Sequence, residues 1–183
     1  MGPTESVILV DESDGETGVE ERLAAHRGGL LHRAVSVFVF NDSGELLLQR
    51  RADTKRPFAG VWANTCCTHP SPGETVIAAG QRRLVEEMGL VVDLDAVGSF
   101  RYKAVDQVSG LTEHELDHVV VGHSSAEPKT DATQVDGFRW VDVSRLRREL
   151  SGDDDYAPWL SHALHAFPHL GLQQPAVSGP GSA

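Results

Sequence analysis

The stretch RAVSVFVFNDSGELLLQRR, residues 33–51, decides the fold class. Residues 33–40 alternate in polarity and are rich in β-branched and aromatic side chains, which favour an extended strand. Asn, Asp, Ser and Gly at residues 41–44 are typical of a turn, and residues 45–51 are typical of a return strand. The pattern predicts a β-hairpin.

The strongest helical pattern covers residues 74–88 and ends at Gly89, because glycine commonly stops a helix at its C-terminus. The residues of one face recur at offsets of three or four: Ile77, Gly80 or Gln81, Leu84 and Met88. This spacing predicts that one side of the helix packs on the core.

Several shorter elements complete the pattern. Further strands are predicted at residues 7–10, 61–66, 96–105, 115–123 and 135–141, and short helices at residues 143–150 and 156–167. The residues that follow the first of these strands, up to residue 18, are acidic and are predicted to form turns. Mixed strands with a few helices packed on them predict an α/β (α+β) sandwich of mixed β-sheets flanked by helices.

The 183 residues are enough for one domain that buries about two-thirds of the surface of its unfolded chain. We expect a single domain over residues 1–170. Residues 171–183, GLQQPAVSGPGSA, have no apolar period and are predicted to be a disordered tail.

The charge balance limits the classes of partner. Sixteen Lys and Arg residues against 27 Asp and Glu residues give a net charge of -11, which argues against nucleic acid because a protein that binds a phosphate backbone needs a basic face. The chain also lacks an apolar run of transmembrane length and a signal-peptide pattern. We therefore expect a cytoplasmic protein that does not bind a membrane.

The two cysteines, Cys66 and Cys67, are adjacent in an extended segment, where successive side chains point to opposite faces. They are poorly placed to bond each other, so a disulfide framework is excluded. The remaining roles are a buried thiol, a metal ligand, or a reactive nucleophile or acid.

The predicted helix has a dense charge pattern. Its Arg–Glu pairs at a spacing of four residues could be a solvated face, worth about 0.2–0.5 kcal/mol each. However, the order Glu74, Arg82, Leu84, Glu86, Glu87, Gly89, Leu90 resembles the Nudix box, a loop–helix–loop motif. In that motif, glutamates on one helix face hold a hard divalent cation such as Mg²⁺ against a diphosphate.

The chain departs from the Nudix box at two positions. Thr68 stands where the motif opens with glycine, and Arg83 stands where it has a glutamate. Loss of that glutamate removes part of the carboxylate cluster that activates water in Nudix hydrolases. Arg83 introduces a cation suited to binding phosphate, so the departure weakens the prediction of a hydrolase.

A second group of residues has the chemistry of a metal site. His69 follows Cys67 by two residues, Glu113 and Glu115 are also two apart, and two more histidines flank a Gly-Gly turn at residues 28–29. Three imidazoles and two carboxylates could bind Mn²⁺, Mg²⁺ or Zn²⁺, and imidazole favours the transition metals. The alternative is that these are ordinary surface or core residues in a chain with nine histidines.

The order of the segments LLHRAVSVFVF, LLLQRR, NTCCTHP, the Nudix-like helix, FRYKA and EHELD is similar to that of type 1 isopentenyl-diphosphate isomerases. The resemblance covers roughly residues 5–170, and NTCCTHP and TEHELD are its most specific parts. It implies a Nudix-fold sandwich and the interconversion of isopentenyl and dimethylallyl diphosphate in isoprenoid biosynthesis. The expected partner is this small-molecule substrate, and we expect a monomer.

The resemblance also implies roles for individual residues. Cys67 and Glu115 match the catalytic pair. The implied metal ligands are His26, His32, His69, Glu113 and Glu115 for a Mn²⁺, Zn²⁺ or Mg²⁺ ion, and Glu87 for a Mg²⁺ ion bound with the diphosphate. The implied substrate-binding residues are Arg22, where the family often has lysine, Arg51, Lys55, Arg83, Tyr102 and Trp159.

Two other functions remain open from the sequence. One is a Nudix hydrolase of a nucleoside or sugar diphosphate. The other is a metal-binding or anion-binding module without catalytic activity.

Overall fold

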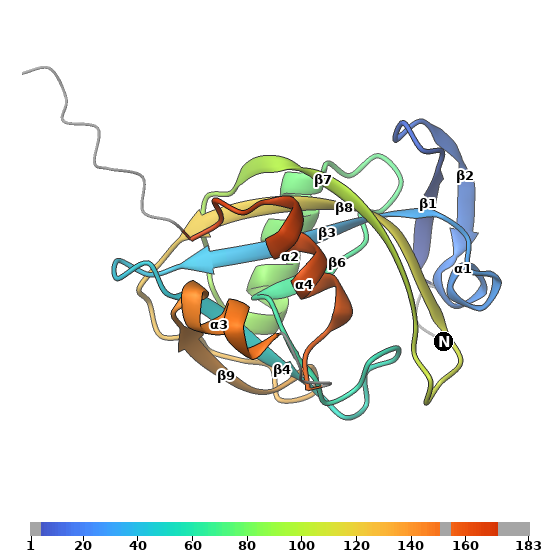
Figure 1. Ribbon diagram of the computed structural model, residues 1–183. Coiled ribbons are helices and arrows are strands. Elements are labelled where there is room, and N and C mark those ends of the chain that lie inside the picture. The colour runs from blue at the N-terminus through green and yellow to red at the C-terminus, as the bar shows by residue number, and fades with distance from the viewer. Residues whose placement is uncertain (1–4, 151–154, 172–183) are drawn as a thin grey trace, which may run out of the picture.

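The computed structural model describes residues 5–150 and 155–171. The predicted disordered tail, apart from Gly171, lies outside these residues. Within them the chain forms nine strands and four helices (Figure 1). The strands are β1 Ser6–Val10, β2 Glu16–Glu21, β3 His32–Phe40, β4 Leu46–Arg51, β5 Trp62–Ala63, β6 Cys66–Thr68, β7 Asp95–Val105, β8 Thr112–His123 and β9 Val135–Val141. The helices are α1 Arg22–Gly28, α2 Val76–Met88, α3 Val143–Glu149 and α4 Pro158–Ala166.

Strand β3 organises the sheet. It pairs in parallel with β8, from His32 opposite Glu115 to Phe40 opposite His123. It pairs antiparallel with β6, where Ser36 lies opposite Cys67. Strand β7 extends this arrangement by pairing with β8, while β4 pairs with β9 and β5. The mixed sheet brings segments that are far apart in the sequence to the two sides of β3.

The prediction of a hairpin over residues 33–51 was wrong in its pairing. The turn at residues 41–44 is present, with the amide of Gly44 bonded to the carbonyl of Asn41, but β3 and β4 are paired only at Phe40 and Leu46. A strand has two hydrogen-bonding edges. Strands β6 and β8 occupy those of β3, and β5 and β9 occupy those of β4. The two strands therefore separate immediately after the turn.

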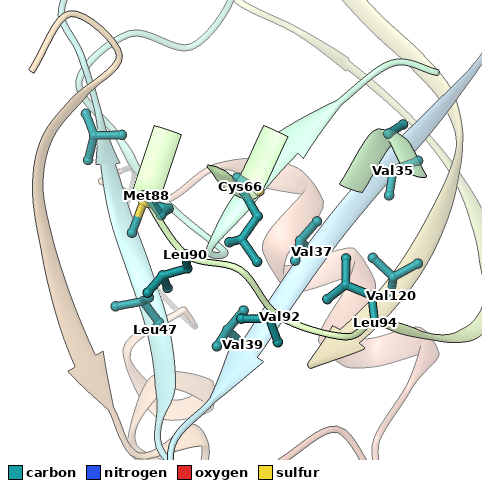
Figure 2. Packing of buried hydrophobic residues seen from close by; sticks show 13 residues of the cluster. Val35, Val37, Val39, Leu47, Cys66, Met88, Leu90, Val92, Leu94 and Val120 are labelled. Carbon is teal, nitrogen blue, oxygen red and sulfur yellow. The ribbon is translucent and has the colours of Figure 1, made fainter. Parts of the chain in front are cut away.

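Alternate side chains of β3 pack on opposite faces of the sheet, as the period of a strand requires. Val35, Val37 and Val39 pack in one cluster with Leu84 and Met88 of α2. Figure 2 shows the three valines and Met88. Phe38 and Phe40 join a second cluster, formed with residues of α3 and α4. Figure 1 shows α2 behind β3, α4 in front of β3, and α3 on the same side in front of β4. The predicted sandwich with flanking helices is confirmed.

Helix α2 confirms the predicted helix with a later start. Thr75 is its N-cap and accepts a hydrogen bond from the amide of Ala78 at 3.2 Å, so Glu74 lies just outside the helix rather than within its first turn. At the other end Gly89 has φ 64°, a left-handed conformation in which its amide reaches back to helical carbonyls. The predicted core face is present, because Leu84 and Met88 are fully buried.

Two N-terminal elements were not predicted. Residues 16–21 form β2, although the acidic composition up to residue 18 suggested turns. Residues 22–28, for which no element was predicted, form α1. Tertiary contacts explain the difference, because the carboxylate of Asp14 binds Arg33 of β3 at 2.8 Å and His118 of β8 at 3.0 Å. Strands β1 and β2 pair antiparallel as an N-terminal hairpin, and α1, which follows β2 directly, lies beside β8.

The strand predicted at residues 135–141 has the same bounds in the structure, and the other predicted elements are present with shifts of at most three residues at their ends. The segment predicted as one strand at residues 61–66 is instead divided into β5 and β6. The longest helix, α2, has 13 residues, and no helix of the described residues has the length and apolar character needed to span a membrane.

Candidate active site

A cavity of about 350 Å³ lies where α1, β6, β7, β8 and α4 meet. Eleven of the predicted site residues line it: Arg22, His26, Arg51, Lys55, Cys67, His69, Arg83, Tyr102, Glu113, Glu115 and Trp159. The other two, His32 and Glu87, are fully buried directly behind this lining. The structure therefore brings all the predicted residues into one region.

The five predicted ligands of the metal site form one cluster. Their ligand atoms all lie within 4.8 Å of one another. Glu113 and Glu115 are two apart on β8 and share a face, and the β3–β8 register places His32 beside Glu115. His69 follows β6 directly, and His26 comes from α1. The Gly-Gly turn between the two N-terminal histidines is the end of α1, where Gly29 has φ 59°.

Backbone carbonyls fix two of the imidazoles. Nδ1 of His26 lies 2.6 Å from the carbonyl oxygen of Arg22, and Nδ1 of His32 lies 2.8 Å from that of Leu30. A carbonyl only accepts hydrogen bonds, so each Nδ1 donates and carries the proton. The lone pair is then on Nε2, which faces the cluster, as in histidines that ligate metals.

Two buried polar atoms of the cluster also indicate that it can hold a divalent cation. Nε2 of His26 and Oε2 of Glu113 are buried and lack a hydrogen-bond partner among the described residues, although they lie 3.1 Å apart. Buried polar atoms without a partner are costly, and both atom types are metal ligands. A cation bound between them would satisfy both.

The two carboxylates of the cluster have opposite pKa shifts. Burial, reinforced by the charge of Glu115, raises the pKa of Glu113 to about 7. Burial alone would also raise the pKa of Glu115, but hydrogen bonds to His32 and His69 hold it well below its usual value. Burial lowers the pKa of His69 to about 4. Near neutral pH, Glu113 therefore holds the proton with which a metal must compete.

We expect the affinity for Mn²⁺ to fall as pH decreases from 7 to 5, by about tenfold per pH unit. In this window Glu113 becomes protonated, and so does His26, because its contact with Glu113 outweighs burial and raises its pKa. His69 and Glu115 are already deprotonated. Calorimetric titration of the metal-free protein with Mn²⁺ at several pH values would measure the slope. In Glu113→Gln the slope should be smaller, because the amide has no proton to lose and His26 is then the remaining ligand that titrates in this range. An unchanged slope in that variant would contradict the assignment.

The two cysteines lie on opposite faces of strand β6. Cys66 points into the hydrophobic core beside Val37 and Met88 (Figure 2), and Cys67 faces the cavity. The Cys67 thiol donates to Oδ1 of Asn64 at 3.2 Å. Burial raises the pKa of Cys67 to about 12, so the group is a neutral thiol at physiological pH. Of the roles left open for the cysteines, that of a buried thiol fits Cys66, whereas Cys67 presents a neutral thiol to the cavity.

Aromatic side chains form the apolar part of the site. Tyr102 of β7 and Trp159 of α4 are buried, with ring centroids 6.3 Å apart. The Tyr102 hydroxyl donates to Oε2 of Glu115 at 2.6 Å, which connects this wall to the metal cluster. The guanidinium of Arg51 lies over the Trp159 ring, 5.3 Å from its centroid. A cation can therefore be accommodated at this ring.

The basic residues surround Glu87, which is fully buried. Oε1 of Glu87 binds the ammonium of Lys55 and lies 2.7 Å from Nη2 of Arg83, and Oε2 accepts from Nε2 of Gln49 at 2.8 Å. Burial is the main cause that lowers the pKa of Lys55. Only the outer pair of the helix, Arg82 with Glu86, matches the solvated-face alternative. The inner pair belongs to the cavity.

Arg22 is more exposed than Lys55 and Arg83. Its side chain is 30% exposed, and Nε lies 2.7 Å from a carboxylate oxygen of Glu5. Arg50 and Arg56, which share the basic segment with Arg51 and Lys55, bind backbone carbonyl oxygens of Gly60 and Asp53.

Sequence reasoning missed several buried polar residues of the site. Ser36 donates to Asp117 at 2.7 Å and lies 3.5 Å from the Cys67 sulfur. Asn64 contacts Cys67 and Trp159, and Gln49 contacts Glu87. Two signals were available: Ser36 interrupts an apolar strand, and Asp117 shares the face of Glu113 and Glu115. Gln49 is also a polar residue in an apolar strand, but its partner is distant in the sequence.

Known proteins resemble this chain over most of its length. The model of the NUDIX domain matches residues 30–163. A protein of Aromatoleum aromaticum named isopentenyl-diphosphate Delta-isomerase 1 is 45% identical over 161 residues, covering 87% of this chain and 90% of the relative. A Nocardia farcinica protein named isopentenyl-diphosphate Delta-isomerase is 46% identical over 160 residues, covering 86% and 91%.

Among solved structures, a Deinococcus radiodurans protein has a TM-score of 0.74 at 22% identity and covers 88% of this chain and 98% of its own. A MutT protein of Methanosarcina mazei has a TM-score of 0.64 at 19% identity, covering 78% and 96%. At these identities the two structures establish the fold alone.

Proposed function

Since this chain belongs to the isopentenyl-diphosphate Delta-isomerases, within the NUDIX-domain proteins, we propose that its cavity binds isopentenyl diphosphate and that Cys67 and Glu115 move the double bond. The protein is an intramolecular isomerase of isoprenoid biosynthesis, and its product is dimethylallyl diphosphate. The observation that carries the residue assignment is that Cys67 and Glu115 face the same cavity as Arg51, Lys55 and Arg83. A hydrocarbon can lie between the first two while its diphosphate reaches the cations.

The reaction adds a proton to the terminal carbon of the double bond and removes one from the carbon that bears the diphosphate methylene. Protonation creates a tertiary carbocation between them. An unactivated alkene is a very weak base, so the acid must be held in contact with it in a site that excludes water. In the free protein Cys67 holds a proton and Glu115 is ionised, so the pair can donate and accept.

The aromatic wall has two roles in this proposal. Trp159 presents a ring that can stabilise the positive carbon, an interaction worth up to about 2 kcal/mol when desolvated. Tyr102 holds Oε2 of Glu115 at 2.6 Å and so fixes the carboxylate beside the substrate. Both rings also exclude water, which would otherwise capture the cation.

Two cation sites complete the proposal. His26, His32, His69, Glu113 and Glu115 would hold one divalent ion: Mn²⁺, Zn²⁺ or Mg²⁺, with the imidazoles favouring the transition metals. When bound, this ion would orient Glu115 and hold it ionised. Glu87 and the main chain of Cys67 would hold a Mg²⁺ ion that enters with the diphosphate.

The substrate must bind through its diphosphate without losing it, because an allylic diphosphate ionises readily. Arg51, Lys55 and Arg83 supply charge-assisted hydrogen bonds for this purpose. We place Arg22 at the rim as an additional contact. We propose that the chain acts as a monomeric cytoplasmic enzyme. We also propose that residues 1–170 form one domain, because β1 pairs with β3 and so joins the N-terminal hairpin to the NUDIX region.

The alternative functions have less support. A Nudix hydrolase of a nucleoside or sugar diphosphate needs more helix carboxylates than remain, because Arg83 replaces one and binds Glu87. A non-catalytic module is contradicted by several enzyme relatives at 43–46% identity over most of the chain.

Incubation with isopentenyl diphosphate in D₂O, with Mg²⁺ and Mn²⁺, tests the proposed function. We expect dimethylallyl diphosphate that carries deuterium, together with deuterium in recovered substrate, because both steps exchange protons with the enzyme. The phosphorus spectrum should keep its diphosphate signals. Release of phosphate without isomerisation would defeat the proposal and favour a hydrolase.

Substitution of Glu87 tests the second cation site. In Glu87→Gln we expect the Mg²⁺ concentration needed for half-maximal rate, or the KM for substrate, to rise about tenfold or more. The reason is that the one carboxylate among the proposed protein ligands of this cation is lost, while Cys67 and Glu115 remain. Steady-state kinetics over a range of Mg²⁺ concentrations measures the effect. Glu86→Gln, one residue away with a half-exposed side chain, is the control; an equal Mg²⁺ dependence in both would contradict the role of Glu87.

A further inference from the structure

Asn64 occupies an unusual position beside the site. It lies between β5 and β6 and is fully buried. It does not itself line the cavity, but it contacts two residues that do. Its amide oxygen accepts two hydrogen bonds, from the Cys67 sulfur at 3.2 Å and from Nε1 of Trp159 at 2.9 Å. Its amide nitrogen donates two, to the carbonyl oxygens of Val37 and Cys66, both at 3.0 Å. The side chain thus uses its full hydrogen-bonding capacity.

The partners of Asn64 define the orientation of its amide. The indole Nε1 of Trp159 can only donate, and the carbonyls of Val37 and Cys66 can only accept. A rotated amide would place its NH₂ group against the indole N–H and its oxygen against two carbonyl oxygens. The oxygen must therefore face Cys67 and Trp159.

We infer that Asn64 is a positioning residue for isomerisation, which uses a single oxygen atom to hold the proton donor and the cation-stabilising ring in fixed relation. This inference rests on the proposed function of Cys67 and Trp159. The two groups come from β6 and α4, on different parts of the chain. Among the described residues, Asn64 is the one side chain to which both are hydrogen-bonded.

The chemistry explains why such a connection matters. A weakly basic alkene is protonated only by an acid in contact with it, and the resulting cation is stabilised only when it lies over the ring face. Both conditions concern the same five-carbon group at successive moments. If the distance between the Cys67 sulfur and the Trp159 ring were wrong, the substrate could not be placed well both for protonation and for stabilisation of the cation.

The test replaces Asn64 with leucine, which has a similar volume and has no acceptor. We expect kcat to fall about 10²-fold, with KM changed less than about threefold, because the diphosphate contacts are untouched. A second measurement is independent of activity: the indole N–H proton of Trp159, assigned by its absence in Trp159→Phe, should move upfield in the NMR spectrum. Loss of the hydrogen bond at 2.9 Å is the cause of that shift.

Thr65→Val is the matched control. Thr65 is the adjacent buried residue, and its hydroxyl bonds only the backbone of Val39 and Leu47 among the described residues. This variant also loses buried hydrogen bonds, so its stability should fall, but its kcat and the Trp159 proton signal should stay near those of the wild type. A purely structural role for Asn64 predicts that both variants behave alike.

Asn64→Asp supplies the conservative rescue and a second route if the leucine variant fails to fold. Placed between two carbonyl oxygens, the carboxyl group should remain protonated and donate to one of them while its other oxygen accepts from Cys67 and Trp159. We expect kcat within about tenfold of the wild type and an unshifted indole signal.

The inference is overturned if Asn64→Leu raises KM with kcat unchanged, if Thr65→Val loses as much kcat, or if the Trp159 signal stays in place. Failure of the proposed function is distinct, because the wild-type protein itself would then show no isomerisation while the NMR comparison would still report on the hydrogen bond.

Discussion

Replacing Cys67 with alanine is expected to reduce the rate of isomerisation by about 10³-fold or more while the fold remains intact. The thiol is a neutral proton donor that faces the cavity, and its burial raises its pKa to about 12 and so keeps it protonated. Alanine fits the same position on β6 but has no proton to give. Turnover of isopentenyl diphosphate, with circular dichroism to verify folding, measures the effect.

Cys66→Ala provides the control because it removes the same atom one residue away. Cys66 points into the core cluster with Val37 and Met88, so its loss should reduce the free energy of unfolding by about 1–2 kcal/mol and leave turnover close to the wild type. Comparable losses of activity in the two variants would refute the assignment of Cys67 to proton transfer.

For Glu115→Gln we expect a loss of similar size that excess metal does not restore. Glu115 serves as a proton acceptor and as a ligand, and its oxygens contact His69 at 3.0 Å and Tyr102 at 2.6 Å. The amide cannot accept the substrate proton and is a weaker ligand. Turnover measured over a wide range of Mn²⁺ concentrations should therefore reach only a low plateau.

Glu113→Gln separates the two roles of Glu115. Glu113 belongs to the same cluster, two residues away on β8, but it has no part in the proton transfer that we propose. Its replacement should weaken metal binding about 10–100-fold and should be largely corrected by added Mn²⁺. If Glu115→Gln were equally corrected, its role would be that of a ligand alone.

The spacing of apolar residues, with the period of a strand or of a helix, was sufficient to predict the core of this fold. The sandwich and α2 followed from the positions of apolar residues, such as Leu84 and Met88 on one helix face. The pairing of β3 could not be read in the same way. Whether residue 36 lies opposite Cys67 or opposite a residue of β4 depends on competition between strands for two edges, and a local pattern contains no information about that competition.

The candidate site was predictable where its residues stand in distinctive motifs. NTCCTHP and EHELD led to Cys67, His69, Glu113 and Glu115, which the structure places around one cavity. The role of Asn64 was not predictable, because its partner Trp159 is 95 residues away and the contact exists only after α4 has docked. The same applies to α1, whose position depends on contacts made by Asp14.

The alternation along β3 has a consequence for how this protein can diverge. This one strand carries the proposed metal ligand His32 and also Ser36, which lies opposite Cys67. Its apolar residues pack on both faces of the sheet. An inserted or deleted residue in β3 would turn every following side chain to the wrong face and misalign β6 and β8 together. Changes of chain length in homologous proteins are therefore tolerable in turns such as residues 41–44 and 106–111, whereas the central strand can change only by substitution.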